Sequence, residues 1–130
     1  MTRALVFILS LVAAAGMVCR GMAWMDYEKG EDREELSLVR QAARLDPLVS
    51  EYAYEEYVQS GDLAALERAI RLEPTKPSYH MFYGLKLIER EPRTAENDQA
   101  AVREICLGAE LKPYSKEYRT ACEDFRAAVT

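Results

Sequence analysis

An eight-residue pattern that decides the fold occurs three times in the chain, as residues 45–52 (LDPLVSEY), 72–79 (LEPTKPSY) and 111–118 (LKPYSKEY). Each copy begins with leucine, has proline two positions later and ends with tyrosine. A stretch containing small residues precedes each copy, at 41–44 (QAAR), 68–71 (RAIR) and 107–110 (LGAE). Proline lacks a backbone N–H and disfavours helix in the residue before it. Each copy therefore predicts a corner where one helix ends and the next begins.

Polar side chains follow each proline at positions suited to start the next helix. Ser50, Thr75 and Ser115 are placed to accept the unpaired N–H groups of a helix N-terminus. Pro77 suits the first turn of such a helix. We expect the leucine and the tyrosine of each copy to pack across the corner.

Between the corners, apolar residues recur with the 3.6-residue period of a helix. The pattern predicts helices at about residues 33–45, 51–59, 63–72, 78–90, 98–111 and 116–129. No segment has the sustained alternation that is typical of a strand. The sequence therefore predicts an all-α protein, in which an N-terminal hydrophobic helix precedes a short α-solenoid of antiparallel hairpins.

The N-terminal segment, 1–25, differs in composition from the rest of the chain. Arg3 is followed by an uncharged stretch at 4–18, which is the layout of a secretory signal. An uncleaved anchor would use residues 4–25, since about 20 apolar residues cross a bilayer and Arg20 is the one charge in this segment. Cleavage after Ala15 or Ala23 is the alternative. A lipoprotein at Cys19 is disfavoured, because Val18 stands where a small residue is needed.

These alternatives give one predicted domain organisation. Residues 1–25 are a signal-anchor or signal peptide, 26–32 a linker and 33–130 the helical repeat domain. The anchor predicts a single-pass membrane protein with the repeat domain on the non-cytoplasmic, periplasmic side. Cleavage predicts a secreted or periplasmic protein instead.

The charge of the chain argues against nucleic acid as a partner. Without Arg3 and Arg20, 15 of the 17 basic side chains remain against 22 acidic ones, and they form no cluster. Binding to phosphates requires a patch of Lys and Arg that displaces counterions. We therefore expect no nucleic-acid partner.

The corners and their flanks resemble the tetratricopeptide repeat, a helix–turn–helix unit of about 34 residues that ends in proline. The resemblance rests on Ala42 and Leu45 before Pro47, on Gly84 at the small position of a first helix, and on Ala101 in the second helix. It covers residues 33–129 and implies about two full units plus half-units. The corner prolines lie at positions 47, 74 and 113, so their spacing is unequal and departs from a regular repeat.

A weaker resemblance concerns the apolar segment followed by the first two corners. This arrangement is similar to the extracytoplasmic helical-repeat tails of bacterial envelope proteins of the O-antigen ligase type. It implies polysaccharide assembly as a setting. The catalytic, multi-span part of such proteins has no counterpart here, so no activity follows.

Few residue types that carry catalysis or bind metals are present. His80 is the one histidine, so a catalytic triad or a Cys/His pair has no spare member. Zinc would need three or four ligands, to which only His80, Cys106 and Cys122 could contribute beyond acids. We predict a protein that is not an enzyme, with no cofactor, metal or small-molecule substrate, and with His80 packed or on the surface.

Cys106 and Cys122 fall on neighbouring predicted helices. In an oxidising compartment they could form a disulfide. The alternative is that both are small buried thiols, which free cysteines commonly are.

The tetratricopeptide resemblance implies a groove lined by the first helix of each unit. Its inner-face positions fall on nine residues of this chain: Glu51, Tyr54, Val58, Ser78, Met81, Leu85, Glu117, Thr120 and Asp124. The set has an apolar middle and acidic ends, which suits a peptide or helix with basic flanks. We therefore expect a protein-interaction scaffold or adaptor of the cell envelope, membrane-tethered or exported. The alternative is a small structural subunit packed permanently on one membrane-complex partner.

Overall fold

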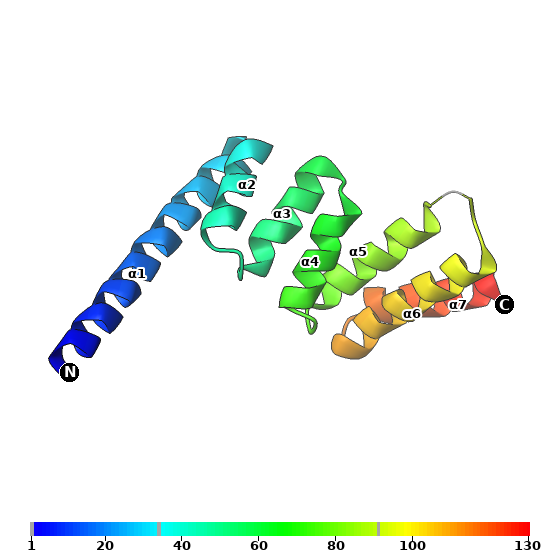
Figure 1. Ribbon diagram of the computed structural model, residues 1–130. Coiled ribbons are helices and arrows are strands. Elements are labelled where there is room, and N and C mark those ends of the chain that lie inside the picture. Colours follow the sequence, from blue (N-terminus) through cyan, green and yellow to red (C-terminus); the bar gives the residue numbers. More distant parts are fainter. Residues whose placement is uncertain (1, 34, 91) are drawn as a thin grey trace. The chain divides into compact units, whose positions relative to one another are not determined.

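The computed structural model describes the backbone of residues 2–33, 35–90 and 92–130, and the side chains of 12–26, 28, 35–90 and 92–130. Over these residues the chain is helical and contains no strand, which confirms the predicted all-α class. The helices are α1 (Thr2–Arg33), α2 (Leu36–Leu45), α3 (Ser50–Ser60), α4 (Leu63–Leu72), α5 (Pro77–Ile88), α6 (Ala95–Leu111) and α7 (Lys116–Val129) (Figure 1). They form two compact units, residues 1–61 and 62–130.

The three corners share one backbone geometry. The residue before each proline, Asp46, Glu73 or Lys112, is the C-cap of its helix, with φ of −136°, −139° and −132° and ψ of 85°, 76° and 65°. Its N–H donates to the carbonyl oxygen four residues earlier, at 2.9–3.2 Å. The following proline therefore forces the C-cap residue out of the helix without leaving this N–H unpaired.

The starts of the next helices follow the prediction in part. Ser115 caps α7, with its Oγ accepting from the N–H of Tyr118 at 3.5 Å. Pro77 is the first residue of α5, as expected. The predicted caps at Ser50 and Thr75 are wrong, because Val49 and Lys76 are the N-caps of α3 and α5. Helix α3 thus begins one residue early and includes Ser50.

The first unit consists of α1, α2 and α3, in which consecutive helices pack side by side. Its buried cluster contains Ala23 of α1, Ala42 of α2 and Tyr52 of α3. Two ion pairs also join these helices. Arg20 Nε donates to Asp46 Oδ2 at 3.0 Å, and Arg40 Nε to Glu56 Oε1 at 3.0 Å. The aspartate and the glutamate are buried, so each pair provides a counter-charge that burial requires.

The predicted membrane anchor is corrected by the structure. Across the part of the chain that was described, no helix is both long and apolar enough to span a membrane. This finding overturns the prediction of a single-pass membrane protein held through residues 4–25. Ala23 and Arg20 of that segment instead contact α2, α3 and the corner between them. The side chains of residues 4–11 lie outside those described, and residues 26–32, predicted as a linker, are helical.

The second unit consists of α4 to α7, again with each helix packed on the next. Its core cluster contains Ile105, Cys106 and Ala109 of α6 with Cys122 of α7. Half-buried apolar side chains of α5, α6 and α7 surround this cluster. A disulfide joins Cys106 to Cys122, whose Cα atoms are 4.7 Å apart.

Two glycines allow the close approach of α5 and α6. A Cβ on Gly84 would lie 2.6 Å from Ile105 Cγ1 and 2.8 Å from the carbonyl oxygen of Ala101. A Cβ on Gly108 would lie 3.0 Å from the carbonyl oxygen of Pro77. A Cβ at Gly84 would therefore collide with α6, and one at Gly108 would crowd the backbone of α5.

Replacing Gly84 by alanine should destabilise the second unit by about 1–3 kcal/mol, because the added methyl group overpacks a contact made partly by backbone. Gly21→Ala in α1 is the matched control, since a Cβ there meets nothing within 4 Å. At that position the higher helix propensity of alanine should raise the free energy of unfolding by at most about 1 kcal/mol. Urea unfolding, monitored by circular dichroism, measures the stability of both variants. Equal midpoints for Gly84→Ala and the unchanged chain would contradict the packing described.

Candidate functional site

The nine residues predicted to line a groove are divided between the two units. Glu51, Tyr54 and Val58 lie on α3 in the first unit, where Glu51 and Val58 are exposed and Tyr54 is half-buried. The exposed residues Glu117, Thr120 and Asp124 lie on α7 in the second unit. Since the set is shared between two units, a continuous groove stays a prediction.

The remaining three, Ser78, Met81 and Leu85, are half-buried on α5. Met81 and Leu85 pack against the cluster formed by Ile105, Cys106, Ala109 and Cys122. Their apolar surface is therefore used, at least in part, by the core of the second unit. A substitution there would test stability as well as binding.

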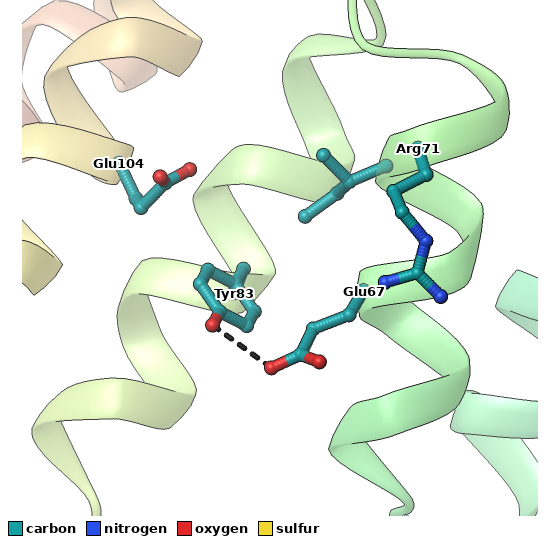
Figure 2. A pocket seen from close by; sticks show the side chains of 5 residues that line it. Glu67, Arg71, Tyr83 and Glu104 are labelled. Atoms are coloured by element: carbon teal, nitrogen blue, oxygen red, sulfur yellow. Dashed lines mark hydrogen bonds between the residues drawn. The ribbon is translucent and has the colours of Figure 1, made fainter.

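The structure contains a cleft that the sequence did not indicate. It has a volume of about 220 Å³ and is lined by Glu67, Ile70 and Arg71 of α4, Tyr83 of α5 and Glu104 of α6. In Figure 2 the Glu67 carboxylate reaches from α4 to the Tyr83 hydroxyl, Arg71 lies on the same helix as Glu67, and Glu104 comes from a third helix. The spacing of Glu67, Ile70 and Arg71 places them on one face of α4, since residues three and four apart are neighbours. All five belong to the second unit.

A buried histidine fixes one wall of this cleft. His80 Nδ1 lies 2.7 Å from Glu104 Oε2, and His80 Nε2 lies 2.7 Å from the carbonyl oxygen of Pro74. A carbonyl oxygen only accepts, so Nε2 carries a proton and donates. Nδ1 then donates to an ionised Glu104 or accepts from a protonated one. In both cases each ring nitrogen has a partner, and the side chain is buried, as the packed alternative predicts.

The Tyr83 hydroxyl lies close to the charged groups of the cleft. It donates to Glu67 Oε1 at 3.0 Å. Burial raises the pKa of Tyr83 above 10.0, and its hydrogen bond to Glu67 and the charges of Glu67 and Glu104 raise it further, while Arg90 lowers it. Both carboxylates thus act on the same hydroxyl. Arg71, which also lines the cleft, and the contact of Glu104 with His80 balance part of this negative charge.

The lining of the cleft is mixed in charge. Glu67 and Glu104 supply acceptors, Tyr83 a hydroxyl, Ile70 an apolar wall and Arg71 a guanidinium. The acidic side chains and the apolar wall match a guanidinium or ammonium on an aliphatic stem, whereas Arg71 opposes one. Among the described side chains, no group of three or more His, Cys, Asp and Glu could hold a metal ion.

A second depression of about 330 Å³ involves other residues of α4 and α5 and is lined by Leu63, Lys86, Glu89 and Arg90. Lys86 pairs with Glu89 three residues later. Its lining thus combines one apolar side chain with an ion pair and a further arginine.

Comparison with known proteins identifies no relative: no protein-family model matches the chain, and no curated protein is significantly similar to it.

Tyr83→Phe should make the stability of the second unit depend less on alkaline pH. The raised pKa means that the fold favours the neutral phenol, so its contribution to stability is complete below pH 10.0 and is lost as the pH rises through the folded-state pKa. Free energies of unfolding at about pH 9 and about pH 11 should differ less in the variant than in the unchanged chain. The variant should still lose some stability at alkaline pH, because the pKa values of Tyr52 and Tyr118 are also raised by burial.

Tyr114→Phe is the control, since Tyr114 is 97% exposed. It should leave the pH dependence unchanged. An alkaline loss of stability that is the same in Tyr83→Phe and Tyr114→Phe would show that the environment of Tyr83 is not the cause.

Proposed function

We propose that this chain is a non-enzymatic protein-interaction module built from tetratricopeptide-like helix hairpins, and that it binds a basic side chain of a peptide partner. The cleft around Tyr83 is the observation that carries the proposal. It combines the carboxylates of Glu67 and Glu104, the Tyr83 hydroxyl, the apolar wall of Ile70 and the guanidinium of Arg71 on three helices of one unit.

Two features support the repeat architecture. The corners at Pro47, Pro74 and Pro113 have the same C-cap geometry and the same closing hydrogen bond. Gly84 meets Ala101 at the closest approach of α5 and α6, which is the pairing that the tetratricopeptide resemblance implies. Stacked helix hairpins of this kind expose surfaces made by several helices, which suits binding of extended partners.

Binding would proceed by charge pairing in a prepared site. An arginine or lysine entering the cleft would lay its methylene stem along Ile70 and place its cationic head against Glu67, beside Tyr83 and Glu104. The contact between His80 and Glu104 holds one carboxylate in place before binding. A fixed side chain loses less conformational entropy on association, which favours affinity.

The alternative function, a structural subunit packed on one permanent partner, is favoured by a different observation. Several large apolar side chains of α1 are exposed, including Val12, Met17, Val18, Trp24 and Met25. Exposed large apolar side chains are common at protein interfaces, and obligate interfaces are the more apolar ones. Under this alternative, partner binding would depend on α1 and not on the cleft.

Selection of random peptides on the immobilised chain tests the proposed function. Enriched peptides should share an arginine or lysine at one position. Glu67→Gln keeps an acceptor for the Tyr83 hydroxyl and removes the charge. It should weaken binding of these peptides by roughly ten-fold, measured by fluorescence anisotropy at low salt.

Glu123→Gln, on the exposed face of α7, is the control for net charge and should bind the peptides with unchanged affinity. Two outcomes would contradict the proposal. One is enrichment of peptides without a shared basic position, and the other is equal affinity for Glu67→Gln and the unchanged chain. A partner captured from cells that is lost on changing α1 residues but kept in Glu67→Gln would favour the structural subunit.

A further inference from the structure

One disulfide attaches the C-terminal helix, α7, to α6. Among the residues of α7, all of which the structure describes, Cys122 alone is buried, and it is bonded to Cys106 of α6. Tyr118, Ala121 and Phe125 of α7 are only partly buried against the core cluster. Thr130, at the end of the chain, forms its hydrogen bonds with α7 itself.

Without the disulfide, α7 is held against α6 by the partly buried side chains of Tyr118, Ala121 and Phe125. It is 14 residues long, and isolated helices of about 12–15 residues are marginal in water. Most of its charged residues are exposed, so its stability comes from the apolar side placed against α6. Release of α7 would expose Ile105 and Ala109, together with parts of the α5 and α6 side chains that pack around them.

One cation lies beside the disulfide. Arg126 Nη2 lies 3.5 Å from Cys106 Sγ, one helical turn after Cys122 on α7. A neighbouring guanidinium stabilises a thiolate, and a disulfide is broken faster when the departing sulfur leaves as a stabilised thiolate. The arrangement therefore makes Cys106 the better leaving group and directs an incoming thiolate to Cys122.

We propose that the Cys106–Cys122 disulfide is a redox-controlled latch, which a dithiol reductant opens to release α7 and uncover an apolar face on α5 and α6. One thiolate of the reductant attacks Cys122 Sγ, the S–S bond breaks, and its electron pair remains on Cys106 Sγ beside Arg126. The second thiol of the reductant loses its proton and attacks the mixed disulfide. Cys122 then leaves as a thiolate and takes up a proton, and the reductant becomes a disulfide. This inference is independent of the proposed cleft function.

Hydrogen exchange of the full chain tests the release. Cys19, a free and exposed cysteine on α1, is first blocked with iodoacetamide. The chain is then reduced with dithiothreitol, and Cys106 and Cys122 are alkylated. Amides of residues 116–129 should lose protection and a hydrophobic dye should bind, while amides of α3 in the first unit should exchange as before. Persistent protection of α7 in the reduced, alkylated chain would overturn the proposal.

A Cys106→Ala/Cys122→Ala variant gives a second measurement without alkylating groups in the core. It should show the same loss of α7 protection with no reductant present. Protection of α7 equal to that of the oxidised chain would overturn the latch, and this comparison separates release from an effect of the alkylating reagent.

The rate of reduction tests the role of Arg126. Arg126→Gln should be reduced by dithiothreitol roughly three-fold more slowly, because the departing thiolate loses its cation. Lys116→Gln, at the exposed start of the same helix, removes the same charge away from the disulfide and should be reduced at the original rate. Equal rates for Arg126→Gln and the unchanged chain, or equal slowing by both variants, would overturn the assignment of Cys106 as the leaving sulfur.

Discussion

The proline two positions after a helix end is the constraint on which both units depend. It forces the residue before it, Asp46, Glu73 or Lys112, out of the helical conformation, to ψ of 85°, 76° or 65°. The N–H of that residue still closes on the carbonyl oxygen four positions earlier, so the corner leaves no unpaired donor there. The chain turns after Leu45, Leu72 and Leu111 with the same geometry, and consecutive helices are brought side by side. Packing between them then requires small residues, which the chain supplies at Ala42, Ala69 and Gly108.

Small residues such as alanine and glycine let the helices pack closely, but they do not select one arrangement of the helices. Polar contacts do select one. The buried carboxylates of Asp46 and Glu56 each have an arginine partner, and the buried ring of His80 has partners on both nitrogens. Leaving such groups unpaired would cost more than the pairs themselves contribute, so they select one arrangement of neighbouring helices. His80 also connects fold and site. The same ring that ties α5 to the Pro74 carbonyl holds Glu104 at the edge of the cleft.

The residues of the candidate site could not be predicted from the sequence. Inner-face positions inferred from the tetratricopeptide resemblance included Met81 and Leu85, which pack against the core of the second unit. Periodicity identifies the apolar face of a helix, but not whether that face meets another helix of the chain or a ligand. The cleft itself joins Glu67, Tyr83 and Glu104, which come from three helices and form no local motif. Each of them alone resembles an ordinary solvated residue on a helix.

The sequence by itself determined the all-helical class, the corner positions and the ends of helices at Leu45, Leu72 and Leu111, because proline geometry and apolar periodicity act over a few residues. The tertiary structure alone decided three other matters. It placed Arg20 and Ala23 against α2, α3 and their corner, although the composition of residues 4–25 had predicted a membrane anchor. It brought Cys106 and Cys122 within bonding reach, and it assembled the cleft around Tyr83. These features depend on which helix faces meet, and that choice is made by packing and charge pairing between residues far apart in the chain.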